Sequence, residues 1–173
     1  MNRTKREKLI QSLPTATDIL ALLPMSGADG GSETVIHTAA GGRLTLSATI
    51  EYVLSCLAER EDKELRLIRR RAARLLTRRR NITLPILHGC VLAPVMVRPI
   101  QRRCGRLGYI NIAHRPLVAA GIGGTDLALR SGTVIHSLWH PLTVRRIVQE
   151  ARAVHYKLLL DVQKELRRVE EFA

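Results

Sequence analysis

Apolar residues recur at two different intervals along this chain, and the longest regular stretch lies in its middle. Between residues 48 and 79 the apolar positions follow one another at steps of three and four, the spacing of one face of an α-helix. Ser47 is a suitable cap for its first turn, where Glu51 places a carboxylate that the helix dipole favours. The polar run at residues 59–64 breaks the apolar stripe, so the pattern allows one bent helix or two helices.

A second helical pattern covers residues 142–169. Its apolar seam advances by alternating steps of four and three, as in a coiled coil, through Val144, Val148, Ala151, His155, Leu158, Val162, Glu165 and Val169. Beside the seam lie Ile147, Val154, Leu159 and Leu166. This helix can pack on a sheet of its own domain or associate with a second copy, so residues 142–170 form a possible oligomerisation helix.

Shorter runs predict strands, while residues 1–13 predict a short polar helix or a frayed arm. An apolar run begins at residue 18 and is stopped by Pro24, and residues 121–125 predict a turn. The expected strands form two hairpins, 33–38 with 43–46 and 126–130 with 133–136, and three further strands, 81–88, 90–97 and 107–114. Internal prolines confine the strands at 81–88 and 90–97 to sheet edges or strand ends, because proline lacks the donor of a ladder hydrogen bond.

The predicted fold class is α+β, with a small antiparallel sheet, a long basic central helix and a C-terminal amphipathic helix. The 173 residues suit a single domain, 1–173, and 46% apolar residues suffice for a core. The chain has no apolar run long enough for a membrane span and no apolar stretch typical of a signal peptide near its start. We therefore expect it inside the cell, with Cys56, Cys90 and Cys104 as free thiols.

Positive charge is concentrated in the middle of the chain. The net charge is +13, and residues 60–106 hold 14 basic and 3 acidic side chains. Arg66, Arg70 and Arg74 stand at i, i+4 and i+8, so they share one helix face. From residue 65 to residue 106 there is no Asp or Glu. A polyanion is therefore the expected partner, since clustered cations raise its local concentration.

Guanidinium groups match phosphate oxygens, so twelve arginines are the candidate nucleic-acid-binding residues. They are Arg66, Arg69, Arg70, Arg71, Arg74, Arg78, Arg79, Arg80, Arg98, Arg102, Arg103 and Arg106. Eight phosphate contacts would give log K a slope of roughly −7 against log salt. The alternatives are a solvated face or a surface for an acidic protein or membrane. Aromatic residues make up 3%, which argues against a platform that stacks many bases.

Other chemistry has weaker support. A zinc site is the alternative for His88, Cys90, Cys104 and His114, although the chain has no Cys-x-x-Cys pair. Arginines around Cys104 would lower the pKa of its thiol, yet no base is positioned to make it a nucleophile. His136 and His140 flank Trp139 and are interpreted as local packing. We expect neither an enzyme nor a bound cofactor.

Four stretches carry a resemblance to a known family. They are Asp18-Ile-Leu-Ala-Leu-Leu-Pro24 with Ser32-Glu-Thr-Val-Ile-His37; Ser55-Cys56 and, after the arginines, Leu84-Pro85-Ile86; Pro94, Cys104-Gly105 and Tyr109-Ile-Asn-Ile-Ala-His114; and Thr125-Asp-Leu-Ala-Leu-Arg-Ser-Gly132, followed by Arg145 and Gln149. Together they resemble the competence transcription factors of Gram-positive bacteria (ComK), over residues 18–152. The family's Phe-Pro-Thr is here Ala93-Pro94-Val95, and its Trp-Ile is Tyr109-Ile110.

The resemblance implies a DNA-binding transcriptional activator that acts as an oligomer at A/T-rich promoter sites. Arginine suits the narrow A/T minor groove, whose negative potential attracts it. We therefore expect a cytoplasmic, nucleoid-associated protein that binds double-stranded DNA, forms a homo-oligomer and makes no membrane contact. The rival hypotheses are an RNA-binding or ribosome-associated protein and a helical protein–protein interaction module.

Overall fold

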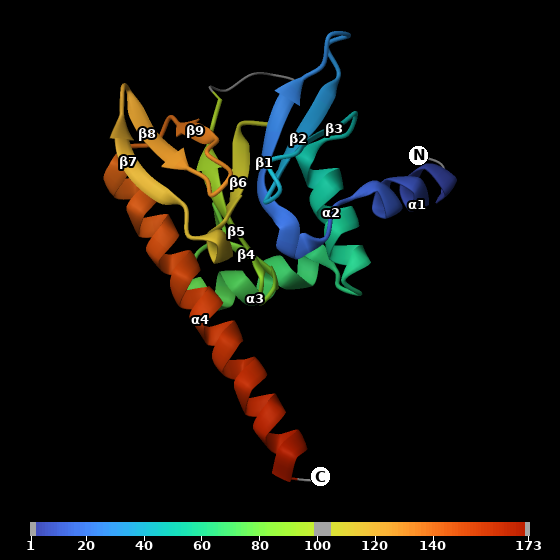
Figure 1. The fold of residues 1–173 in the computed structure, drawn as a ribbon, viewed down its shortest axis with the longest axis vertical. Coiled ribbons are helices and arrows are strands. Elements are labelled where there is room, and N and C mark those ends of the chain that lie inside the picture. Colours follow the sequence, from blue (N-terminus) through green and yellow to red (C-terminus); the bar gives the residue numbers. More distant parts are fainter. Residues whose placement is uncertain (1–2, 99–104, 172–173) are drawn as a thin grey trace.

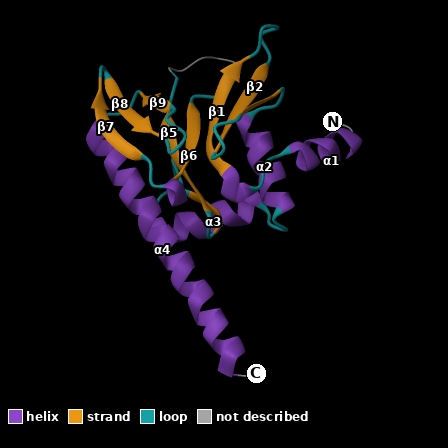
Figure 2. Ribbon diagram, viewed as in Figure 1, coloured by secondary structure: helices purple, strands orange, loops and turns teal. Residues whose placement is uncertain are grey.

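The fold is α+β, as the sequence predicts, and its centre is a six-stranded antiparallel sheet. The structure is a computed structural model that describes residues 3–98 and 105–171. The strand order is β3-β2-β1-β6-β5-β4 (Figures 1 and 2). These strands are β1 (Ile19–Ser26), β2 (Ser32–Thr38), β3 (Arg43–Leu46), β4 (Leu84–Leu87), β5 (Cys90–Met96) and β6 (Leu107–Asn111).

A second, three-stranded antiparallel sheet lies against one face of the first. Its order is β7-β8-β9, formed by β7 (Leu117–Gly121), β8 (Gly124–Ala128) and β9 (Val134–Ser137). The hairpin predicted around Ser131 and Gly132 is confirmed, with Leu127 opposite Ile135. The strand β7 was not expected from the sequence.

The central helical segment consists of two helices, so the two-helix alternative is confirmed. They are α2 (Ile50–Arg60) and α3 (Leu65–Leu76). The cap of α2 is Thr49 and not Ser47 as predicted, because the Thr49 hydroxyl accepts the Tyr52 N–H at 3.3 Å. A polar turn at residues 61–64 separates the helices, and there the Lys63 ammonium donates to the Ile86 carbonyl.

The first and last helices are α1 (Arg3–Ser12) and α4 (Pro141–Glu171), which begin and end the described chain. Short 3₁₀ turns occupy Ala16–Asp18 and Ile112–His114. The predicted C-terminal helix is confirmed, and its first half packs on the protein's own sheets. In Figure 1 its second half extends beyond the rest of the molecule.

Two hydrophobic cores cover the two faces of the large sheet. Along β5, Cys90 and Leu92 face one core while Val91, Ala93 and Val95 face the other. Helices α1, α2 and α3 cover the first face, and the small sheet and α4 cover the second. This alternation follows from the period of two along a strand. It leaves the outer faces of α3 and α4 exposed to solvent.

Prolines occur inside three strands, and each is accommodated where one side of its strand lacks a neighbour. Pro85 lies in the edge strand β4, as predicted. Pro94 lies in β5 beyond the last residue that pairs with β4, which is Leu92. Pro24 does not stop its strand, a correction to the prediction, because β1 pairs with β6 only at Ala21 and Leu22.

Candidate nucleic-acid interface

Helix α3 holds its arginines outward because its opposite side is anchored in the core. Ile68 and Ala72 are buried, at 7% and 1% exposure, and they fix the rotation of the helix. Positions 66, 70 and 74 then fall on the solvent side, one helical turn apart. Their three arginine side chains are exposed.

The end of α3 turns back and brings two more arginines to this side. Thr77 adopts a left-handed conformation with φ of 51°, and the Arg78 N–H donates to the Ala73 carbonyl at 3.1 Å. This is the hydrogen-bond pattern of a Schellman cap. As a result Arg70, Arg74, Arg78 and Arg79 line one shallow hollow of about 360 Å³. We call Arg66, Arg70, Arg74, Arg78 and Arg79 the arginine face.

Counter-charges are scarce on the arginine face. Arg78 forms an ion pair with Glu150 of α4, at 3.0 Å. Among the residues that the structure describes, no carboxylate lies within ion-pair distance of Arg66, Arg70, Arg74 or Arg79. The negative end of the α3 dipole also stabilises cations at the helix C-terminus. The face therefore presents guanidinium donors that an external anion can bind.

Two of the predicted arginines of α3 point elsewhere. Arg69 pairs with Glu51 of α2 at 2.8 Å and lies beside the buried Tyr109. Burial raises the pKa of the Tyr109 hydroxyl, and the nearby Arg69 opposes that shift. Arg71 lines a groove between α3 and α4 on the other flank. Neither residue belongs to the arginine face, although both belong to the same run in the sequence.

Two of the predicted loop arginines, Arg98 and Arg106, do not join the arginine face. Arg98 and Arg106 lie where β5 ends and β6 begins, since Val97 N–H donates to the Arg106 carbonyl. Helix α3 lies at the other end of β5, beside β4 (Figure 1). A seven-residue strand separates the two ends by about 20 Å. Arg80 is exposed after α3, and Arg102 and Arg103 lie outside the described residues.

Sequence reasoning missed cations on α4 that lie near the arginine face. Arg146 is exposed and stands four residues before Glu150, so it shares the side of α4 that meets Arg78. Arg145 and Arg152 are exposed beside β7, where they line a second hollow with Gln149. The spacing of these residues was visible in the sequence, but the pairing of Glu150 with Arg78 was not.

The residues proposed for zinc are not gathered in the described part of the chain. Cys90 is buried, and burial raises the pKa of its thiol to about 12. The His114 ring is hydrogen-bonded through Nε2 to the Thr17 carbonyl oxygen at 2.7 Å, and His88 is exposed. No three His, Cys, Asp or Glu side chains within residues 3–98 and 105–171 are grouped as metal ligands. Cys104 lies outside those ranges.

The remaining sequence predictions concern thiols and histidines. Cys56 and Cys90 are free and buried. His136 and His140 are both exposed, and His136 is hydrogen-bonded to Asp126 at 2.7 Å. The Trp139 carbonyl accepts the Thr125 hydroxyl.

Comparison with family models, curated proteins and solved structures finds no match to this chain. Within the described residues, none of the helices combines the length and the apolar character that crossing a bilayer requires.

Proposed function

We propose that this protein binds double-stranded DNA through the arginine face. The observation that carries the proposal is that four of its five guanidinium groups have no carboxylate partner among the described residues. Ordinary charged surfaces mix both signs, and a mixed surface binds a polyanion weakly. Here the cations lie along the solvent side of α3 and in the turn that follows it, so their positive potentials add.

The shape of the face supports phosphate and groove contacts rather than base stacking. The hollow between Arg74 and Arg79 is shallow and is lined by guanidinium groups, which donate paired hydrogen bonds to phosphate oxygens. Arginine also enters narrow A/T minor grooves, where the negative potential is enhanced. Since none of the residues that line the hollow is aromatic, A/T-rich duplex DNA is the preferred ligand of this proposal.

A salt titration tests the proposal. The four arginines of this face that have no carboxylate partner in the described chain predict that log K falls with log salt at a slope of roughly −4 on a B-form duplex. Fluorescence anisotropy with A/T-rich and G/C-rich duplexes of equal length measures the slope and the preference. A slope near zero would contradict phosphate binding. Equal affinity for the two duplexes would contradict the groove preference.

Competition with structured RNA separates DNA binding from RNA binding. The same cations attract both polymers, but the A-form minor groove of RNA is wide and lacks the narrow-groove potential. We expect A/T-rich duplex to displace a hairpin RNA of equal charge at equal salt. Displacement in the opposite direction would replace DNA by RNA as the ligand.

We further propose a role in transcriptional control, which rests on the resemblance to the competence transcription factors. In that role the protein lies in the cytoplasm with the nucleoid and activates promoters as a homo-oligomer. Chromatin immunoprecipitation tests it, and enrichment at A/T-rich promoter sites is the expected result. Uniform genome coverage would favour an architectural role instead.

A further inference from the structure

The second half of α4 carries apolar side chains that nothing in the described chain covers. Val154, at 2% exposure, is the last fully buried residue of the helix up to residue 168, where the description of its side chains ends. Beyond it, Leu159, Val162 and Leu166 are 39%, 41% and 59% exposed, and they follow one another at steps of three and four. We call residues 158–171 the α4 arm. A helix stripe of this kind is stable in water chiefly when another surface buries it.

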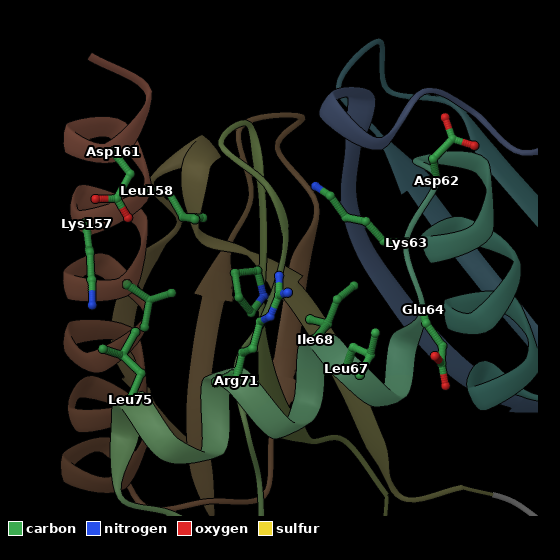
Figure 3. A pocket seen from close by; sticks show the side chains of 13 residues that line it. Asp62, Lys63, Glu64, Leu67, Ile68, Arg71, Leu75, Lys157, Leu158 and Asp161 are labelled. Atoms are coloured by element: carbon green, nitrogen blue, oxygen red, sulfur yellow. The ribbon is translucent and has the colours of Figure 1, made fainter. Parts of the chain in front are cut away.

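A groove lined by apolar and charged side chains opens at the base of this arm. It lies between α3 and α4 and has a volume of about 530 Å³. Figure 3 shows Leu67 and Leu75 of α3 along one side and Leu158 of α4 at one end. Leu75 is 45% exposed. The groove therefore offers apolar surface of the kind that would cover the arm.

Two acids at one end of the groove match two cations of the arm, although both surfaces carry mixed charge. Lys63 lies at the same end of the groove, Arg71 lies in its middle, and Glu165 of the arm pairs with Arg168. Asp62 and Glu64 stand at the end farthest from α4, in the turn that precedes α3 (Figure 3). The arm carries Lys164 and Arg167 near its tip, and both are exposed. At the other end of the groove, Lys157 and Asp161 of α4 present one charge of each sign.

We propose that this groove receives the α4 arm of a second copy of the chain, in a two-fold dimer that exchanges arms. The two arms would cross near Leu158, where Lys157 of one copy faces Asp161 of the other. Each arm would then continue along α3 of the other copy until Arg167 reaches Glu64. The lengths agree, since α3 spans about 18 Å and the arm about 20 Å at 1.5 Å per residue.

A second copy fits the groove better than the chain's own arm or an unrelated partner. The arm cannot fold back into its own groove, because α4 is one continuous helix from Pro141 to Glu171. The arm and the groove belong to the same chain, so one two-fold contact covers both surfaces in both copies at once. The dimer specifies the homo-oligomer of the proposed function, yet it does not depend on DNA binding, because the arginine face lies outside the contact.

The mass of the full chain in solution tests the dimer. Analytical ultracentrifugation at about 50 µM should give twice 19.3 kDa for the native chain. Leu166→Asp on the arm and Leu75→Asp in the groove should each give the monomer mass, since each buries a charge in an apolar contact. Leu142→Asp is the matched control, because Leu142 is 68% exposed on the body half of α4. The control should remain dimeric.

Charge exchange tests the position of the arm. Glu64→Arg and Arg167→Glu should each weaken the dimer about tenfold, and the two together should restore it to within about twofold. Far-ultraviolet circular dichroism verifies that each variant is folded.

Three results would overturn the proposal. They are a monomeric native chain, a dimer that Leu166→Asp leaves intact, and a dimer that Leu166→Asp breaks but Leu75→Asp does not. The last result would mean that the arms pair only with each other. Binding of a short DNA duplex by the Leu166→Asp monomer is measured separately, so failure of the dimer and failure of DNA binding remain distinguishable.

Discussion

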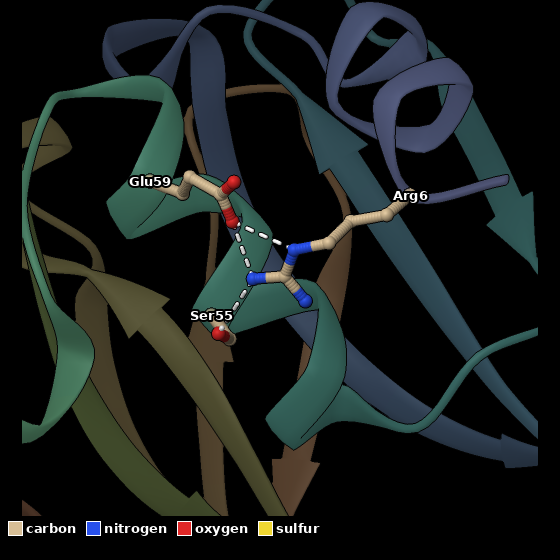
Figure 4. A network of polar contacts seen from close by, with 3 residues as sticks. All are labelled: Arg6, Ser55 and Glu59. Carbon is tan, nitrogen blue, oxygen red and sulfur yellow. Dashed lines mark hydrogen bonds and ion pairs between the residues drawn. The ribbon is translucent and has the colours of Figure 1, made fainter. Parts of the chain in front are cut away.

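Arginine has opposite surroundings in two regions of this molecule. At the contact of α1 with α2, Arg6 donates to Glu59 at 2.7 Å and to Ser55 at 3.2 Å (Figure 4), and its guanidinium lies 5.1 Å from the centre of the Tyr52 ring. The hydrogen bond with Glu59 raises the pKa of Arg6 above its ordinary value. On the arginine face, Arg70 and Arg74 are exposed and have no such partner in the described chain.

The comparison shows that arginine content by itself does not identify a binding surface. Residues 1–59 contain 5 basic and 6 acidic side chains, so carboxylates are near at hand in the sequence, and Arg6 pairs with one of them. The segment from residue 65 to residue 106 contains no Asp or Glu. Its cations therefore pair with carboxylates of other segments or remain without an ion pair. Arg6 therefore joins two helices, whereas four of the five guanidinium groups of the arginine face have no carboxylate partner among the described residues.

Charge reversal on the arginine face should have the largest effect. Arg70→Glu combined with Arg74→Glu should lower duplex affinity by about 100-fold or more, because two contacts are lost and two repulsions are added. Stability should change by less than about 0.5 kcal/mol, since both side chains are exposed. Anisotropy and urea unfolding measure the two quantities.

The matched control is Lys5→Glu combined with Lys8→Glu on α1, which reverses the same charge on exposed residues at another place. If the control lost as much affinity as the α3 variant, net charge and not the arginine face would govern binding.

Removal of Arg6 should have the opposite effect, a loss of stability with little change in duplex affinity. Arg6→Ala should lower the free energy of unfolding by about 1 kcal/mol, a modest value because the Arg6–Glu59 pair is partly exposed to solvent. Duplex affinity should stay within about twofold of the native chain. A loss of affinity without a loss of stability would erase the distinction between the two regions.

Glu150→Gln should leave Arg78 without its carboxylate partner. The Glu150 carboxylate holds Arg78 at 3.0 Å, so neutralising it frees that guanidinium for phosphate. We expect duplex affinity to rise about threefold and the salt slope to steepen by roughly one contact. Unchanged affinity would show that Arg78 does not reach the ligand.

The smallest expected effect is on the pH dependence of stability, where Arg43 lies beside His37. His37 lies opposite Arg43 in the β2–β3 pair, and partial burial together with Arg43 lowers the pKa of His37 below 6.5. The unfolded chain therefore binds this proton at a higher pH than the folded chain. Stability should fall as pH drops from 7 to 5. In urea unfolding across that range, His37→Asn should flatten the decline, and an unchanged decline would assign it to other groups.

Local patterns predicted the elements better than they predicted the site. Helical spacing identified residues 48–79 and 142–169, and the turn pairs Gly41-Gly42 and Ser131-Gly132 identified the hairpins, because both signals lie within a few residues. The exposed positions of Arg70 and Arg74 follow from the same spacing. Strand β7 was not predicted, because its residues, Leu117 to Gly121, show no alternation of apolar and polar side chains.

The remainder of the site depends on contacts between distant segments. Arg69 and Arg70 are neighbours in sequence, yet Arg69 turns to a carboxylate on α2 and Arg70 faces solvent. Arg78 meets a residue of α4 that lies 72 positions later. Arg98 follows the arginine run in sequence but is carried to the far end of β5. No local pattern could have separated these cases, because the sheet and the two cores decide them.

The unbroken course of α4 has a consequence for spacing. The helix that supplies Glu150 to Arg78 continues without a glycine or an internal proline into the arm. The direction in which the arm side chains point is therefore fixed relative to the first half of the helix. One extra residue inserted after Tyr156 would swing everything beyond it by about 100° and turn Leu166 away from its present side, whereas seven extra residues would return it to within about 20°. Only insertions of whole heptads would therefore keep the arm facing the same side of the molecule.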